Sequence, residues 1–127
     1  MISYRKLVSY LRSQHKYPVN IKKNYSVIVI PGSQYHITIF QDQWDDYEIV
    51  SGKAYHLFHI SSDNTQSRCS SYFWVNKYNY KIKKIPAIYF LYNQPTYNFF
   101  SSTRNPCNLR NIKKHLIIFQ RILRNVH

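Results

Sequence analysis

The carboxyl-terminal residues 105–126 are NPCNLRNIKKHLIIFQRILRNV, and their pattern sets the architecture expected for the rest of the chain. Asn105 and Pro106 favour a helix start, because Asn can cap a helix and Pro is tolerated in its first turn. Apolar residues then recur at spacings of three and four, at Leu109, Ile112, Leu116, Phe119 and Leu123. This spacing predicts an amphipathic helix over about residues 106–125, with one face packed against a core.

The other side of this predicted helix carries cations and no acids. Its basic residues fall largely off the apolar face: Arg110, Lys113, Lys114, Arg121 and Arg124. A cationic face without counter-charges in its own segment requires an outside partner, and a phosphate backbone is the simplest one. We therefore expect this helix to contact nucleic acid. A solvated cationic face and a protein partner are the alternatives.

The charge excess extends over the whole chain. The sequence has 127 residues, with 18 Lys and Arg against 5 Asp and Glu, for a net charge of +13 at pH 7. Such an excess destabilises a compact monomer through self-repulsion, so it indicates a partner such as nucleic acid or an anionic membrane surface. The length fits one basic domain over 1–127.

The charge is also unevenly distributed. Residues 24–76 contain all of the acids and only two cations, Lys53 and Arg68. The other cations fall in three acid-free blocks, residues 5–23, 77–84 and 104–124. If both termini form helices on one side of a sheet, their blocks share one surface. The predicted RNA-binding residues are Arg5, Lys6, Arg12, Lys16, Lys22, Lys23, Lys77, Tyr78, Tyr80, Lys81, Lys83, Lys84, Arg104, Arg110, Lys113, Lys114, Arg121 and Arg124.

The middle block, residues 76–84, mixes lysines with tyrosines and is expected to be a loop. Lys can contact phosphate, and Tyr can stack on an unpaired base. An exposed loop whose tyrosines cap the core is the competing interpretation.

The amino-terminal residues 2–16 also have helical spacing. Tyr4, Leu7, Val8 and Leu11 would form the apolar face. This segment contains Arg and Ser but no acid, so it resembles a mitochondrial transit peptide as well. We favour a structural helix.

Short β-branched and aromatic runs between the two helices predict strands. They lie at residues 25–30, 35–40, 47–50, 54–60, 72–75 and 85–92, with a solvated acidic loop over 41–48. Because short turns separate them, we expect an α+β fold with a mostly antiparallel sheet of about five strands over about residues 25–92.

Composition gives expectations about the setting of the protein. Lys, Asn, Ile, Tyr and Phe are abundant while Gly and Ala are scarce, which is typical of an AT-rich genome such as that of an organelle, a low-GC protist, a phage or a large DNA virus. Cys69 and Cys107 are isolated, which fits a reducing compartment, although one disulfide between them stays an open alternative. The chain shows no signal-peptide pattern and no apolar run long enough to span a membrane.

Together these features predict a structural RNA-binding protein that uses no cofactor and is not an enzyme. Small size, strong basicity, charged ends and the lack of a catalytic motif are typical of ribosomal proteins. We expect a small ribosomal protein of a mitochondrion or other organelle, with rRNA and neighbouring proteins as partners. A cytoplasmic location is the alternative.

Other function classes have weaker support. His56 and His59 are three residues apart, so on a strand they face opposite sides of the sheet and cannot bind the same metal ion. We therefore expect no metal site. A metal-free ribonuclease or toxin could use His36, Tyr55, His56 or Arg68 for acid–base chemistry. An accessory subunit of an organellar membrane complex would instead present its basic face to lipid or protein.

Overall fold

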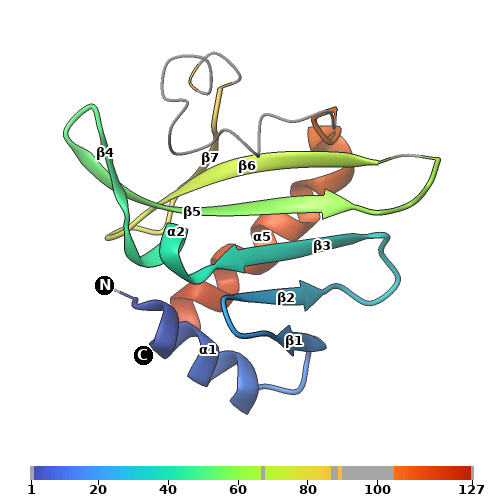
Figure 1. Ribbon diagram of the computed structural model, residues 1–127, viewed down its shortest axis with the longest axis horizontal. Coiled ribbons are helices and arrows are strands. Elements are labelled where there is room, and N and C mark those ends of the chain that lie inside the picture. Colours follow the sequence, from blue (N-terminus) through green and yellow to red (C-terminus); the bar gives the residue numbers. More distant parts are fainter. Residues whose placement is uncertain (1, 67, 87–88, 90–104, 127) are drawn as a thin grey trace.

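The computed structural model describes residues 2–66, 68–86, 89 and 105–126, which form an α+β fold (Figure 1). Helices lie at both ends of the chain and an antiparallel sheet lies between them, as predicted, although the sheet has seven strands instead of about five. In chain order the elements are α1 (Tyr4–Ser13), β1 (Val19–Ile21), β2 (Tyr25–Val29), β3 (Tyr35–Phe40), α2 (Gln41–Asp45), β4 (Glu48–Val50), β5 (Lys53–Ser62), β6 (Cys69–Asn76), β7 (Ile82–Lys84) and α5 (Leu109–Asn125).

The sheet follows the order β1-β2-β3-β5-β6-β7, and β4 pairs with β5 beside this path. Strand β5 accommodates two neighbours on one edge, because β3 pairs with its second half and β4 with its first residues. Every pair is antiparallel. The predicted sheet is therefore correct in kind, and it starts earlier, at β1, than sequence analysis indicated.

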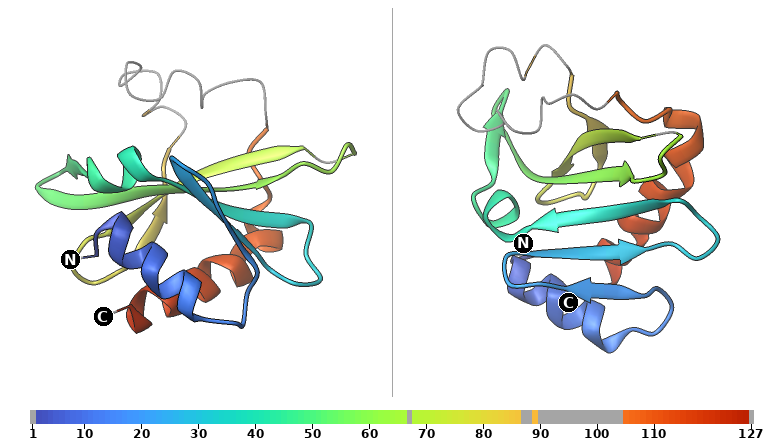
Figure 2. Two further views of the ribbon diagram at one scale, coloured as in Figure 1. Left: turned by 60° about the horizontal axis from the view of Figure 1, so that its bottom comes forward. Right: turned by 45° about the vertical axis from the view of Figure 1, so that its right-hand side comes forward.

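Both terminal helices pack on the same face of the sheet (Figure 2). From α1, the Tyr4 hydroxyl forms a 2.6 Å hydrogen bond with the Ser26 hydroxyl on β2. From α5, the Phe119 ring lies 4.4 Å from the Phe58 ring on β5. Phe58 and Phe119 are both fully buried, so the core lies between the sheet and the two helices.

Helix α1 buries the four residues that its spacing predicted, Tyr4, Leu7, Val8 and Leu11. The Ser3 side chain caps the first turn by accepting from the Lys6 N–H. The segment is thus a structural helix, shorter at both ends than the predicted span of 2–16.

Helix α5 differs from the prediction in its start and in its buried face. Asn108, and not Asn105, caps the helix, because its side chain accepts from the Arg110 N–H. Leu109 is exposed, so one of the five expected core residues lies off the buried face, whereas Leu116 is half-buried and packs against the core. The residues that α5 does bury are Ile112, His115, Ile118, Phe119, Ile122 and Leu123. A wide buried arc accommodates two adjacent rows of side chains, and spacing alone selected only one of them.

The acidic segment 41–48 is not the solvated loop expected. Residues 41–45 form the short helix α2, and Trp44 is fully buried. Its indole N–H donates to the Ile2 carbonyl, and its ring stacks on His56 at 4.1 Å. The carboxylates of Asp42, Asp45 and Asp46 are exposed, whereas the indole packs in the core.

Two further predictions near residue 80 are corrected. Residues 82–84 form β7, which pairs with β6, so the expected 76–84 loop is a tight turn followed by a strand. The expected strand over 85–92 is not formed at Tyr89, which is helical, and its residues 87, 88 and 90–92 lie outside the described part of the chain.

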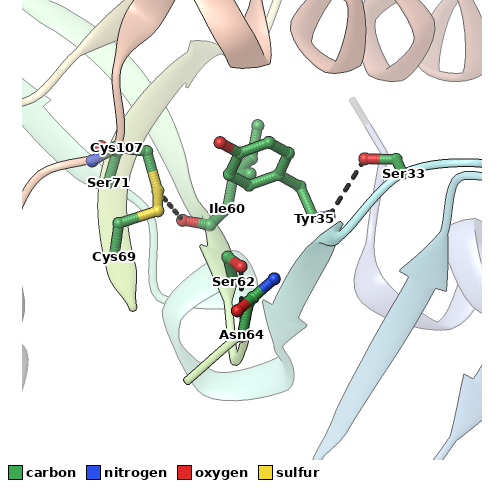
Figure 3. The surroundings of a disulfide bond; sticks show 8 residues. All are labelled: Ser33, Tyr35, Ile60, Ser62, Asn64, Cys69, Ser71 and Cys107. Carbon is green, nitrogen blue, oxygen red and sulfur yellow. Dashed lines mark hydrogen bonds between the residues drawn. A yellow bond between two sulfur atoms is a disulfide. The ribbon is translucent and has the colours of Figure 1, made fainter. Parts of the chain in front are cut away.

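The two cysteines are joined in a disulfide (Figure 3). Cys69 begins β6, and Cys107 lies just before α5. The Cys107 N–H also donates to the Ser71 hydroxyl, and the Ser70 N–H donates to the Asn105 carbonyl. The segment leading into α5 is therefore fixed to the sheet both covalently and by hydrogen bonds, which resolves the alternative left open by the sequence.

Candidate nucleic-acid interface

The outer side of α5 carries a row of basic residues. We call this the cationic stripe, and it consists of Arg110, Lys113, Lys114, Arg121 and Arg124. All of these side chains are exposed, and their spacing places them on one side of the helix, with exposed Ile117 between them. At 1.5 Å per residue, the stripe extends over about 20 Å.

No carboxylate neutralises the cationic stripe within the described ranges of the chain. Within those ranges, the contact at ion-pair distance is between His36 Nε2 and an Asp63 carboxylate oxygen, 3.7 Å apart, and it involves no residue of the stripe. Three of the acids, Asp42, Asp45 and Asp46, lie on or directly after α2. Asp45 is already engaged, because its carboxylate accepts from the Tyr4 N–H at 2.9 Å. The stripe is therefore a fixed array of positive charge, open to an external anion.

The amino-terminal block adds positive charge on the same side of the sheet. Arg5, Lys6 and Arg12 are exposed on α1, which packs on the same sheet face as α5 (Figure 2). Lys16 is exposed after α1, and Lys22 and Lys23 are exposed between β1 and β2. The shared helical side expected for the two terminal blocks is thus present in the fold.

The middle block divides into two groups. Lys81 and Lys84 are exposed. Lys84 pairs with Phe73, whose ring is in the core beneath α5, so the side chain of Lys84 extends from the helical face of the sheet. The Gln120 side-chain amide donates to the Tyr80 carbonyl at 2.9 Å, which places the β6–β7 turn against α5.

The other two lysines of this block are engaged with aromatic rings. Lys77 is only 6% exposed, and its ammonium lies 3.3 Å from the centre of the Tyr47 ring. The Lys83 ammonium lies 5.0 Å from the ring centre of Tyr55 and 5.3 Å from that of Trp74, on the opposite face of the sheet from α5. Lys77 therefore does not present a free ammonium to phosphate, contrary to prediction, and Lys83 does not join the helical surface.

The two tyrosines of the turn also differ. Tyr80 is half-buried and packs against the core, as the core-capping interpretation expects. Tyr78 is 70% exposed, as a stacking residue requires. The Tyr47 ring that covers Lys77 was not among the predicted residues. Tyr47 lies in the acidic segment, and the pairing of β4 with β5 brings it to the turn. The predicted contact residue Arg104 lies outside the described part of the chain.

The residues considered for acid–base chemistry do not converge. His56 faces the helical side, where its Nδ1–H donates to the Trp44 carbonyl. Burial lowers the pKa of His56 to about 4. Tyr55 precedes it on β5 and faces the other side, while His36 pairs with Asp63 and Arg68 is exposed before β6. The arrangement holds His56 as a neutral core residue and assembles no nucleophile–base pair among these four.

His115 is another buried imidazole of the core. Its Nε2 lies 2.7 Å from the Ser33 hydroxyl, and its ring makes an edge contact with Tyr35. Burial lowers the pKa of His115, and the nearby Lys114 adds to this effect. His115 is therefore held neutral inside the stripe-bearing helix and adds nothing to its positive face.

A second aromatic cluster lies on the face of the sheet opposite the helices. This cluster combines the aromatic residues Tyr55 and Trp74 with the aliphatic residues Leu57 and Ile85. Glu48 at its margin accepts a hydrogen bond from the Tyr89 hydroxyl. Burial raises the pKa of Glu48, although the hydrogen bond from Tyr89 opposes the shift.

Neither a metal-binding cluster nor a membrane-spanning helix occurs among the described residues. Over the described ranges, no group of three or more His, Cys, Asp and Glu residues could hold a metal ion. Among the helices described, none combines the length and apolar character that crossing a bilayer requires. His56 and His59 do face opposite sides of β5, since His56 stacks on Trp44 and His59 on Phe40.

Comparison with known proteins identifies a viral relative. The chain is 52% identical over 126 residues to uncharacterized protein R703 of Acanthamoeba polyphaga mimivirus, and the alignment covers 99% of this chain and 93% of the viral protein. The chain belongs to the R703 family. No family model matches the chain, and no solved structure matches it. The relative is uncharacterized, so this relationship assigns no activity to the family.

Proposed function

We propose that this member of the R703 family is a structural RNA-binding protein, and that the cationic stripe on α5 is its main contact with the phosphate backbone. The observation that supports this most strongly is the row of five exposed cations along one helix face, with no carboxylate bound to any of them in the part of the chain described. Burying or neutralising such a row requires an extended polyanion, which a nucleic-acid backbone provides.

RNA is favoured over duplex DNA because the basic surface is irregular. Exposed cations extend from α5 to α1, to the β1–β2 connection and to Lys81 and Lys84. A distribution over several elements suits a folded RNA, whose phosphates do not follow one regular groove. Phosphate contacts of this kind fix position and orientation and carry no base-specific readout.

The setting of the RNA is a separate part of the proposal. A ribosomal role in a mitochondrion or another organelle, next to other proteins of a large assembly, stays a prediction from composition. The relationship to a mimivirus protein favours a viral setting, in which the RNA need not be ribosomal. Copurified RNA, identified by sequencing from the native source, distinguishes these settings.

A charge-matched pair of variants tests the proposed contact. Lys113→Gln with Lys114→Gln removes two charges from the stripe, and Lys53→Gln with Arg68→Gln removes two exposed charges outside all three basic blocks. Affinity for a labelled RNA hairpin is measured by fluorescence anisotropy at 100 mM salt. Because each lost phosphate contact forgoes the release of about one counterion, the stripe variant is expected to bind on the order of tenfold more weakly, with the control close to wild type.

The outcomes separate the function classes. Equal losses in both variants contradict a localised interface and indicate a response to net charge alone. Shortened RNA on a denaturing gel contradicts a purely structural role and supports the ribonuclease alternative. Absence of RNA binding, combined with binding to anionic lipid vesicles, refutes the proposal in favour of the membrane-complex alternative.

A further inference from the structure

The turn between β6 and β7 holds one exposed aromatic ring on a firmly anchored backbone. Tyr78 is 70% exposed, the highest exposure among the large hydrophobic side chains described. Residues close to it in the turn are anchored: Lys77, directly before it, lies under the Tyr47 ring, and Tyr80, two positions after it, packs against the core. The ring therefore projects from the surface while its flanking residues are fixed.

Hydrogen bonds within the turn restrict its backbone further. The side-chain carbonyl of Asn76, itself buried, accepts from the N–H groups of Tyr78 and Asn79. The Asn79 side chain accepts from the Lys81 N–H. Tyr80 adopts a positive φ of 59°, which closes the turn and sends the chain into β7.

Contacts to three other elements fix the turn within the fold. The Lys77 N–H donates to the Ala54 carbonyl at the start of β5, and the Lys77 ammonium lies over Tyr47 beside β4. The Gln120 side chain of α5 donates to the Tyr80 carbonyl. Gln120 directly precedes Arg121 of the cationic stripe and is one helical turn from Arg124, so the turn adjoins the carboxyl-terminal half of the stripe.

We infer that Tyr78 is a stacking platform for an unpaired base of single-stranded RNA, positioned where a strand that follows the cationic stripe reaches the β6–β7 turn. This inference rests on the proposed RNA-binding function and specifies its substrate class. An exposed ring on an anchored backbone loses little conformational freedom when a base stacks on it. Lys81, exposed three residues further on, can contact the phosphate of a stacked nucleotide.

Duplex RNA cannot use this platform, because its bases are paired and stacked within the helix. The protein is therefore expected to prefer single-stranded or looped RNA to a blunt duplex of equal length. Stacking on an aromatic side chain contributes about 1–3 kcal/mol per base, which corresponds to about 5- to 150-fold in affinity.

The test compares three variants of the full-length protein on two probes, a labelled 12-nucleotide single strand and a blunt 12-base-pair RNA duplex. Tyr78→Ala removes the ring, Tyr78→Phe keeps it, and Ile49→Ala is the control because Ile49 is an exposed apolar residue, at 65%, that lies outside the turn. Tyr78→Ala is expected to lose about 5- to 150-fold on the single strand and less than twofold on the duplex. Tyr78→Phe and Ile49→Ala are expected to stay within twofold of wild type on both probes.

A 2-aminopurine placed in the single strand provides an independent readout. Its fluorescence is expected to fall on binding to wild type and to Tyr78→Phe, and to remain high with Tyr78→Ala. Thermal unfolding of the three variants is expected to match wild type, because the substituted side chains lie mostly outside the core.

Several results would overturn the inference. No loss on the single strand with Tyr78→Ala, while wild type still binds both probes, removes the stacking role and leaves the stripe proposal standing. Equal losses on both probes likewise contradict stacking. Failure of wild type to bind either probe refutes the proposed function itself. A change of association state in Tyr78→Ala, seen by sedimentation without a change in RNA affinity, would assign the ring to a protein contact instead.

Discussion

The disulfide between Cys69 and Cys107 gives the sharpest prediction about stability. The two residues are 38 positions apart, and the bond closes that loop in the unfolded chain. In the loop-entropy model, a closed loop of this size stabilises the folded state by about 4 kcal/mol at 25 °C. For a chain of 127 residues this corresponds to a fall in Tm of about 15 °C when the bond is removed.

Two independent perturbations should give the same result. Reduction of wild type with a thiol reagent removes the bond without changing the sequence, and Cys69→Ser with Cys107→Ser removes it permanently. Both should lower Tm by a similar amount in thermal unfolding followed by circular dichroism. The reagent should leave the double variant unchanged, which controls for effects of the reagent itself.

The reasoning has a clear point of failure. Alkylation of the native, non-reduced protein should label no thiol, because both sulfurs are in the bond. If alkylation after reduction shows that both thiols have been released, and Tm still stays within about 2 °C of the oxidised protein, the cross-link does not constrain this chain and the loop-entropy argument is refuted.

Three further predictions concern buried and capping residues. The pKa of His56 is about 4 in the folded state and 6.5 in the unfolded state, so the unfolded chain binds more protons between these values. His56 should therefore contribute a loss of stability of about 3 kcal/mol as the pH falls from above 6.5 to 4, and urea unfolding of His56→Gln should show a pH-dependent loss smaller by that amount. Phe119→Ala should cost about 3–5 kcal/mol and Ile117→Ala under about 0.5 kcal/mol, because only Phe119 is buried, and equal effects in denaturant titrations would contradict the core assignment. Asn108→Ala should cost about 1 kcal/mol through the lost helix cap while Asn105→Ala should not, and the reverse order of Tm values would move the start of α5.

The sequence was informative where periodicity and burial agree. In α1 one row of side chains meets the core, so spacing alone identified Tyr4, Leu7, Val8 and Leu11. In α5 the buried arc is wider, and His115 is buried against Ser33 and Tyr35 although its residue type is polar. A pattern of apolar residues cannot indicate such a position, because its burial depends on a hydrogen bond from a distant turn.

Short elements were missed because tertiary pairing creates them. β1 and β7 have three residues each, too few for a period-two pattern to emerge, and they exist because β2 and β6 present free edges to them. Helix α2 was not predicted because its acidic residues are typical of a solvated loop. In the fold these acids face solvent, while Trp44 packs in the core beside His56. The disulfide remained one of two alternatives, because two isolated cysteines in a sequence do not show whether the fold brings their sulfurs together.

The candidate interface was predictable in part. Cations off the apolar face of a helix, without acids nearby, correctly predicted an exposed basic surface on α5. The same reasoning failed for Lys77, because the ring that covers it comes from Tyr47, thirty residues earlier, through β4 and β5. Charge patterns therefore identify exposed helix faces well, whereas turn lysines depend on which rings the fold brings to them.

The salt dependence of RNA binding tests the central claim most directly. The logarithm of the association constant is measured against the logarithm of salt concentration for wild type and for the variant with Gln at Arg110, Lys113, Lys114, Arg121 and Arg124. If the five cationic side chains contact single-stranded phosphates, the slope should become shallower by about 3.5, at about 0.7 per contact. An unchanged slope in a variant that remains folded would show that the stripe does not touch the backbone, and would contradict the account.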